Sequence, residues 1–317
     1  MSDRLIDSAL DRTIAPGYSR FGLAVRRRLG SWPADPPRMD GKVVLVTGAS
    51  SGLGRASAVG LARLGADVRV LTRDSDRSAK LARELEKETG GRVSGVTCDV
   101  SDLTSVRRFT GRFAAAEDRL DVLINNAGVM PPERTETADG IELTLATHVV
   151  GPHLLIERLS PLLEAAAPSR VINVSSGGMY SQQLDLDDLQ TEHETYRKNR
   201  VYAKTKRAQV VLTHEWARRL EPSGVAVQSM HPGWADTQGV RDSLPGFSKI
   251  TRGIIRDAEQ GADTIVWLAA SPDAQRPTGA FWHDRRPRPE HYLPGRGESD
   301  QDRRRLWDAV QELAGAV

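Results

Sequence analysis

The sequence predicts an α/β fold, a doubly wound parallel sheet with helices on both faces. Between residues 42 and 230, short runs rich in β-branched residues alternate with longer amphipathic stretches. Strands that alternate with helices of this length indicate βαβ units, and right-handed crossovers between them cover both faces of the sheet. In such a sheet, ligands bind in the crevice beyond the carboxyl ends of the strands.

Each expected element follows from its own residues. The strands are short apolar runs, and the helices are longer stretches that carry apolar residues at helical spacing. In chain order, the expected strands are 42–47, 67–72, 92–97, 120–125, 170–175 and 225–230. The expected helices are 52–64, 76–89, 102–117, 141–163 and 200–220.

Three parts of the chain differ in composition. Residues 41–284 carry the alternating pattern and are expected to form one domain. Residues 1–40 hold several short structural signals and end in a proline-rich linker at 32–37. Residues 285–317 begin with Pro, Gly and charge, and end in a short helix near 302–313. We expect the two flanking segments to be arms on one core.

The composition excludes several classes of protein. The 317 residues are 39% hydrophobic and 27% charged, enough apolar material for a globular core. The formal net charge is +2, so the overall charge does not favour nucleic acid as a partner. Cys98 is the single cysteine, which excludes an intrachain disulfide. The N-terminus lacks a secretory pattern and no apolar run approaches the ~18 residues of a membrane span, so we expect a cytoplasmic protein.

Basic stretches in the two arms have two interpretations. Residues 26–28 are three arginines among apolar residues, which is also typical of a helix lying on an anionic membrane surface. We favour an arm that packs its apolar side on its own domain and leaves its arginines solvated, with the arginines of 285–288 solvated as well. A metal site is not expected, because His214-Glu215 is followed by Arg218 where a second zinc-binding histidine is required.

A glycine-rich turn follows the first strand. Gly48, Gly52 and Gly54 allow a tight turn, close approach of the backbone to a pyrophosphate, and tight packing of the next helix. The loop also contains Ser50, Ser51 and Leu53. The unpaired N–H groups at the start of that helix then face the phosphates. The strand–turn–helix context indicates a Rossmann-type dinucleotide-binding loop.

The same residues allow a second interpretation. Gly48-Ala49-Ser50-Ser51-Gly52 also fits the G-x-S-x-G turn of serine hydrolases. That chemistry needs a downstream acid and histidine, and it leaves Gly54 unexplained. We therefore favour dinucleotide binding.

Tyr202 and Lys206 are the residues that carry the predicted chemistry. They lie four apart on a strongly helical stretch, so their side chains share one face. A phenol has an ordinary pKa near ~10 and is a poor base at neutral pH. A nearby ammonium favours the phenolate, and we expect Lys206 to lower the pKa of Tyr202 toward the range of efficient proton transfer.

Five ordered motifs together resemble the short-chain dehydrogenase/reductase family. They are the glycine loop, Asn125-Asn126-Ala127-Gly128, Ser175-Ser176, Tyr202-x-x-x-Lys206 and His231-Pro232-Gly233. The resemblance covers residues 41–283, and the order of the motifs makes it specific. The longer strings at 174–179 and 231–237 are similar to a branch of this family near the retinol dehydrogenases.

The resemblance implies a mechanism in which hydride moves between a nicotinamide cofactor and an alcohol or carbonyl. Tyr202 would exchange the proton, Lys206 would lower its pKa and bind the nicotinamide ribose, and Ser176 would hold the substrate oxygen. Besides the glycine loop, Tyr202 and Lys206, the cofactor would contact Asp99, Val100, Asn126, Ala127, Gly128, Pro232 and Thr237. For Asp99, an acid at the start of the next helix, ahead of Asp102, is an equally good interpretation.

One position departs from the family pattern. Many members carry an asparagine three residues before the glycine that aligns with Gly151, where it supports a water in a proton relay. This chain has His148 there. Because imidazole both donates and accepts near neutral pH, His148 could keep a relay role. A packed histidine with only a structural role is the alternative.

The end of the second strand predicts NADP(H), with NAD(H) as the alternative. Members that prefer NAD usually carry an acid here, whereas this chain has Thr72 followed by Arg73. Arginine suits a phosphate because its donors form a fixed fork. Asp74 complicates the prediction, since a small error in the alignment would restore an acid.

The remaining predictions concern substrate and assembly. The family resemblance implies that the stretch 234–256 forms a mobile lid over the substrate. Its mixed apolar and basic character suggests a hydrophobic small-molecule alcohol or carbonyl. The family resemblance implies a homo-oligomer. A non-catalytic NADP(H)-binding sensor or scaffold is the alternative function, although such proteins commonly lose the tyrosine or the lysine.

Overall fold

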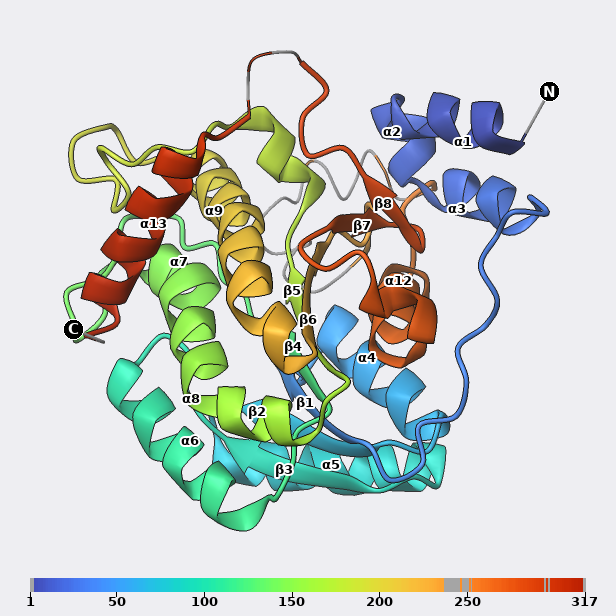
Figure 1. Cartoon of the computed structure of the whole chain (residues 1–317), viewed down its shortest axis with the longest axis horizontal. Coiled ribbons are helices and arrows are strands. Elements are labelled where there is room, and N and C mark those ends of the chain that lie inside the picture. The colour runs from blue at the N-terminus through green and yellow to red at the C-terminus, as the bar shows by residue number, and fades with distance from the viewer. Residues whose placement is uncertain are drawn as a thin grey trace.

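A computed structural model describes residues 3–236, 246, 251, 253–293, 295 and 297–315. Its centre is an eight-stranded sheet with the order β3-β2-β1-β4-β5-β6-β7-β8 (Figure 1). The strands are β1 Val43–Thr47, β2 Asp67–Thr72, β3 Val93–Thr97, β4 Val122–Asn125, β5 Ser169–Val174, β6 Val225–Met230, β7 Phe281–His283 and β8 Arg286–Arg288. The pairs from β3 to β7 are parallel, and β8 is antiparallel to β7. The predicted doubly wound sheet is confirmed.

Helices form a layer on each face of this sheet (Figure 1). One layer contains α4 Gly52–Arg63, α5 Ser75–Thr89 and α12 Ala258–Ala270, and the other contains α6 Leu103–Ala116, α8 Gly151–Ala165 and α9 Lys198–Leu220. The predicted helix at 141–163 is interrupted. It consists of α7 Leu143–Leu145, a π-helical turn at Ala146–Val150, and then α8. π-Helical turns inside α-helices often mark functional sites.

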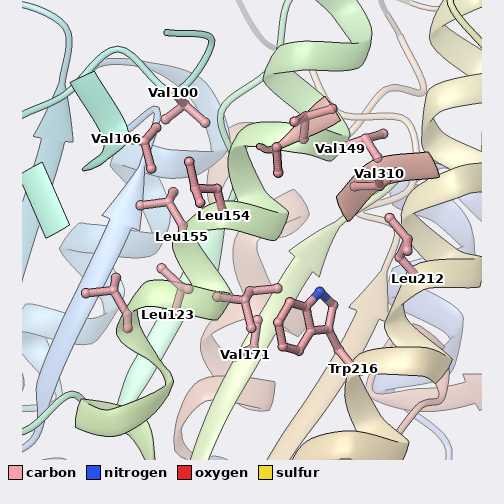
Figure 2. Close-up of a cluster of buried hydrophobic side chains, with 14 of the residues drawn as sticks. Val100, Val106, Leu123, Val149, Leu154, Leu155, Val171, Leu212, Trp216 and Val310 are labelled. Carbon is pink, nitrogen blue, oxygen red and sulfur yellow. The ribbon is translucent and has the colours of Figure 1, made fainter. Parts of the chain in front are cut away.

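The strands separate two hydrophobic cores because successive side chains point to opposite faces. Leu45 contributes to one core, whereas its neighbours Val44 and Val46 contribute to the other. The first core also holds the C-terminal helix α13 Asp300–Leu313, whose Val310 lies near Leu212 and Trp216 of α9 (Figure 2). The predicted C-terminal helix therefore exists and covers part of the central domain.

The strand order reverses between β1 and β4. After β3 at one edge, the chain returns to the far side of β1, so a crevice opens beyond the carboxyl ends of β1 and β4. The glycine loop follows β1 and Asn126 follows β4, which brings these two motifs to the same crevice.

The N-terminal arm forms three short helices, α1 Asp3–Asp11, α2 Ile14–Tyr18 and α3 Arg20–Arg27. They lie beside β7 and β8 (Figure 1). The expectation that the arginines of 26–28 are all solvated is wrong, because Arg26 is buried. Its guanidinium makes ion pairs with Asp7 at 2.9 Å and Asp284 at 2.7 Å.

The arginines of 285–288 also differ from the prediction. Arg285 is buried and ion-paired with Asp263 at 2.8 Å, and Arg288 is ion-paired with Asp7 at 2.9 Å. The predicted boundary at residue 284 falls in the two-residue turn between β7 and β8, so the start of the C-terminal segment adds a strand to the sheet. Within the described residues, no helix is both long and apolar enough to cross a bilayer.

Candidate active site

The glycine loop has no room for side chains at two of its three glycines. A Cβ on Gly54 would lie 2.4 Å from the carbonyl oxygen of Gly48, and a Cβ on Gly48 would lie 2.8 Å from the Cα of Ala127. Gly48 and Gly52 also have positive φ values of 64° and 54°, which favour glycine. The turn therefore keeps its backbone close to the second motif, after β4.

Asn126 joins the two motifs by hydrogen bonds. Its side-chain Nδ2 donates to the carbonyl oxygens of Thr47 at 2.9 Å and Gly48 at 3.2 Å. The backbone N–H groups of Asn126 and Ala127 both donate to the Thr47 hydroxyl, at 2.9 and 3.0 Å. These bonds hold the ends of β1 and β4 together at the crevice.

The helix that follows the glycine loop begins at an open N-terminus. Ser51 occupies the N-cap position of α4, but its side chain makes no capping hydrogen bond and is exposed. Ser50, Gly52 and Leu53 are half-buried at the same turn. The first N–H groups of α4 are thus available to an anionic ligand such as a phosphate.

The end of β2 lies next to this loop. β1 and β2 pair in parallel with Thr47 opposite Leu71, so Arg73 follows β2 beside the glycine turn, and it is exposed. Asp74 is used as the N-cap of α5, where its carboxylate accepts from the N–H of Arg77 at 2.8 Å. Unlike Asp74, Arg73 is a charged side chain at this turn that takes no part in capping the helix α5.

Asp99 and Val100 lie at the end of the neighbouring strand β3. The carboxylate of Asp99 accepts from the N–H and hydroxyl of Ser101, at 2.9 and 2.7 Å. The helix α6 is capped by Asp102, three residues after Asp99, so a contact with the adenine and an acid ahead of the helix both stay predictions for Asp99. Val100 is buried, and its carbonyl oxygen would be 2.0 Å from a Cβ on Gly151.

Tyr202 and Lys206 lie on α9, as their spacing predicts. The Lys206 side chain is 3% exposed, and its Nζ donates to the carbonyl oxygen of Val174 at 2.9 Å. The Ser175 hydroxyl donates to the Lys206 carbonyl oxygen at 2.8 Å, which fixes α9 against the end of β5. Lys206 Nζ lies 5.5 Å from the centroid of the Tyr202 ring.

The electrostatics of this pair differ from the expectation. Burial raises the pKa of the Tyr202 phenol, and the neighbouring Ser176 hydroxyl opposes that shift. Burial also lowers the pKa of Lys206 to about 7. Desolvation of the phenol is thus the main influence on its pKa, and the structure does not support the predicted lowering of the Tyr202 pKa by Lys206.

Ser176 lies on the turn that follows β5. Its hydroxyl is the N-cap acceptor of the 3₁₀ helix Gly177–Ser181, taking the N–H of Gly178 at 3.1 Å. The side chain is half-buried and lies on the same side of the crevice as Tyr202. A serine, a tyrosine and a lysine thus converge from β5 and α9.

Comparisons with known proteins agree with this geometry. A family model described as short chain dehydrogenase matches residues 42–245. This chain belongs to the short-chain dehydrogenase family. It is an oxidoreductase that acts on CH–OH groups.

Three relatives illustrate the range of similarity. The chain is 41% identical over 282 residues to dehydrogenase/reductase SDR family member 12 of Bos taurus, with 87% of each chain covered. It is 37% identical over 300 residues to retinol dehydrogenase 14 of Mus musculus, with 89% of each covered. A short chain dehydrogenase from Burkholderia cenocepacia, solved in complex with NADP, matches with a TM-score of 0.62 and 28% identity, over 77% of this chain and 96% of that chain. The resemblance to the branch near the retinol dehydrogenases is confirmed.

His148 lies on the π-helical turn of this dehydrogenase and is fully buried. Its Nε2 accepts the backbone N–H of Val129 at 3.1 Å, and its Nδ1 lies 2.8 Å from the Thr205 hydroxyl. Because Val129 can only donate, we assign the neutral tautomer with the proton on Nδ1. Burial and the charge of Lys206 hold the His148 pKa well below its usual range. Both nitrogens are engaged, which favours the packed histidine over the relay.

The loop after β6 completes the crevice. Gly233 has a φ of 77°, and its N–H donates to His231 Nδ1 at 3.0 Å. The carbonyl oxygen of Pro232 accepts from Arg256 at 3.2 Å. Thr237 and most of the expected lid at 234–256 lie outside the described residues, so their predicted roles remain predictions.

The serine hydrolase interpretation finds no support in the geometry. Across the part of the chain that the structure describes, Ser50 makes no hydrogen bond to a histidine, and no cluster of His, Cys, Asp and Glu residues could hold a metal ion. Thr205, Arg256 and Tyr18 are the contributors that the sequence analysis missed. Thr205 lies three residues after Tyr202, a spacing that could have drawn attention to it, whereas no local signal identifies the other two.

Proposed function

We propose that this dehydrogenase interconverts an alcohol and a carbonyl on a hydrophobic small molecule, with NADP(H) as its cofactor. The observation that carries the proposal is the convergence of Ser176, Tyr202 and Lys206 beside a crevice whose glycine loop has no room for a side chain at Gly48 or Gly54. Proteins of this fold that only bind the nucleotide commonly lose the tyrosine or the lysine. The intact pair therefore favours catalysis over a sensor or scaffold.

Several features of the crevice support NADP(H) as the cofactor. The pyrophosphate would lie against the glycine loop and the open N-terminus of α4, and Arg73 would contact a phosphate on the adenosine ribose. The same face would place Asn126, Ala127 and Gly128 along the nucleotide. The NADP-bound Burkholderia cenocepacia relative supports this assignment.

The substrate oxygen would lie between Ser176 and Tyr202. NADP(H), when bound, supplies or accepts the hydride. In reduction, the Tyr202 phenol donates its proton to the carbonyl oxygen while the Ser176 hydroxyl holds that oxygen in place. Lys206, when protonated, stabilises the phenolate left on Tyr202. In oxidation, the same groups act in the opposite sense.

A hydrophobic substrate is supported by the named relatives. Retinol dehydrogenase 14 of Mus musculus carries in its name a hydrophobic alcohol, and the chain is 37% identical to it. The lid expected at 234–256, with its mixed apolar and basic residues, is consistent with this class. A cytoplasmic location and a homo-oligomeric assembly remain predictions.

The test is nucleotide binding followed by turnover. NADPH and NADH are titrated, and turnover is measured with a panel of hydrophobic ketones, aldehydes and alcohols. Tyr202→Phe is expected to keep NADPH affinity and lose at least ~10²-fold in kcat, the usual cost of a missing general acid. Tyr292→Phe is the matched control, since this phenol bonds to Asp11 at 2.9 Å and contacts neither Ser176, Tyr202 nor Lys206 in the described structure, and its kcat should be unchanged. Folded protein that binds neither nucleotide would refute the proposal.

A further inference from the structure

The N-terminal arm reaches the candidate active site through Tyr18. This side chain is 5% exposed, and its ring meets the His231 ring edge-on with centroids 4.3 Å apart. The Tyr18 carbonyl oxygen accepts the N–H of Trp234 at 2.8 Å. His231 and Trp234 flank Pro232, so the arm lies directly against the loop that follows β6.

Tyr18 also contacts the turn that carries the candidate catalytic serine. A Cβ added to Gly177 would lie 2.8 Å from the Cε2 of Tyr18 and 3.4 Å from the Cε1 of His231. Gly177 directly follows Ser176 and needs no unusual φ, so close approach of the Tyr18 ring explains the glycine better than backbone conformation does. The tyrosine thus touches both the Ser176 turn and the loop after β6.

A buried charge network fixes the arm in this place. Asp284 lies between Arg26 and Arg256, with ion pairs of 2.7 and 2.6 Å, and all three side chains are about 1% exposed. Arg26 donates to the Gly17 carbonyl oxygen at 2.7 Å, and Arg256 donates to that of Ser19 at 3.2 Å. Both guanidinium groups therefore hold the backbone on either side of Tyr18. Such buried charges are tolerated only when paired, so the arm cannot leave without exposing or orphaning them.

The turn that presents Asp284 is itself held in an uncommon conformation. Asp284 and Arg285 both have positive φ values, 51° and 58°. A non-glycine residue in this region is strained and persists only where the surroundings determine its conformation. The guanidinium groups of Arg26 and Arg256 supply such surroundings from the arm and from the loop preceding α12.

We propose that Tyr18 is a positioning residue of this active site, which holds the Ser176–Gly177 turn and the loop after β6 in their catalytic places. The inference rests on the proposed function, since it assigns a role within the same reaction. Tyr18 acts through Gly177 and His231 rather than on the substrate. Because orientation contributes strongly to catalysis, a shift of about 1 Å in the serine could cost up to ~10²-fold in rate.

The experiment compares Tyr18→Leu, Gly177→Ala and the double variant with the wild type. Phe21→Leu is the matched control, since Phe21 belongs to the same arm but is 62% exposed. For each protein we would measure kcat, KM, the pH dependence of alcohol oxidation, thermal unfolding, and the affinity for adenosine 2′,5′-bisphosphate. The last probe reports only on the glycine-loop end of the site.

Tyr18→Leu is expected to lower kcat by about tenfold or more, with unchanged affinity for the bisphosphate. It should also move the rising limb of the pH profile to higher pH, because the Ser176 hydroxyl lowers the pKa of Tyr202 and would be less well placed. Gly177→Ala should show the same two changes. Gly177→Ala should lower kcat by a smaller factor in the Tyr18→Leu variant than in the wild type, since the clashing Cε2 atom of Tyr18 is then absent. Phe21→Leu should behave like the wild type.

A folded Tyr18→Leu protein with the wild-type kcat and pH profile would overturn the inference. If Tyr18→Leu does not fold, the kcat of Gly177→Ala is the deciding measurement. A Gly177→Ala protein with the wild-type kcat would then overturn the inference. Failure of the proposed function is separate, since the wild type itself would then reduce no carbonyl. In that case the free energy of unfolding of the two single variants and the double variant tests the contact between Tyr18 and Gly177. If the losses of stability in the two single variants add up to the loss in the double variant, the contact is contradicted.

Discussion

The Nδ1 of His148 lies 2.8 Å from the Thr205 hydroxyl, and this hydroxyl in turn donates to the Tyr202 carbonyl oxygen at 2.9 Å. On its other side, His148 accepts the N–H of Val129. A buried imidazole therefore joins the segment after β4 to the turn of α9 that carries the candidate catalytic tyrosine. The His148 and Tyr202 rings also meet edge-on, with centroids 5.3 Å apart.

We expect His148→Ala to behave as the loss of a positioning residue. Removing the ring leaves a cavity and an unpaired N–H at Val129, which together should lower the free energy of unfolding by about 2–4 kcal/mol. The kcat should fall while the pH profile keeps its midpoint. His148→Gln, whose amide can both accept and donate, should restore part of the stability. A shifted pH midpoint with unchanged stability would instead establish the relay role.

Arg73→Ala tests the preference for NADP(H). A charged hydrogen bond contributes about 1.5–3 kcal/mol, so NADPH affinity should fall by roughly ten- to a hundredfold while NADH affinity changes little. Arg77→Ala is the matched control, because Arg77 is also exposed at the start of α5. Titrations followed by nucleotide fluorescence measure both constants. Equal losses for the two nucleotides would contradict the assignment.

Gly54→Ala tests the close packing of the glycine loop. The added methyl would lie 2.4 Å from the Gly48 carbonyl oxygen and 2.5 Å from the Asn126 side chain, so the loop must move. We expect NADPH binding to be lost, with a lower melting temperature. Gly111→Ala is the control, since a Cβ there meets nothing within 4 Å and alanine favours the helix α6. Wild-type NADPH affinity in Gly54→Ala would show that the loop does not approach the nucleotide.

The buried lysine predicts a pH dependence of stability. Burial lowers the Lys206 pKa from 10.5 to about 7, so between these values the unfolded chain binds a proton that the folded chain has released. The free energy of unfolding should therefore rise with pH in this window, with a slope of at most about 1.4 kcal/mol per pH unit from this group. Urea unfolding at several pH values measures it.

Two variants isolate the contribution of Lys206. Lys206→Met should be more stable than the wild type near pH 7, and its advantage should shrink as the pH rises toward 10. Lys80→Met is the control, because the Lys80 side chain is 75% exposed and should leave the slope unchanged. Identical slopes for Lys206→Met and the wild type would show that the lysine is not desolvated in the folded protein.

The sequence was most informative where the signals are local. The glycine loop, Asn126, Ser176 and Tyr202 each follow or face the end of a strand, and parallel strands bring those ends to one edge. Their meeting at one crevice could therefore be predicted without knowing any contact. The π-helical turn could not be predicted in this way, because its His148 bonds to Val129 and Thr205, which belong to two other segments of the chain.

The arm shows where local patterns fail. Arg26 looks like part of a solvated basic stretch, since its partners Asp7 and Asp284 lie 19 and 258 positions away. Burial of an arginine depends on carboxylates that another part of the chain supplies, and periodicity carries no information about them. The three-residue strands β7 and β8 are similarly too short for a pattern to reveal.

The pairing of Arg26 with Asp284 has a consequence for how the molecule is made. The two residues bracket nearly the whole polypeptide, and contacts of such separation carry a large loop-closure cost and form late. During synthesis, the nucleotide crevice built by β1 to β6 can assemble well before the last strands leave the ribosome, whereas the Tyr18 contacts must wait for them.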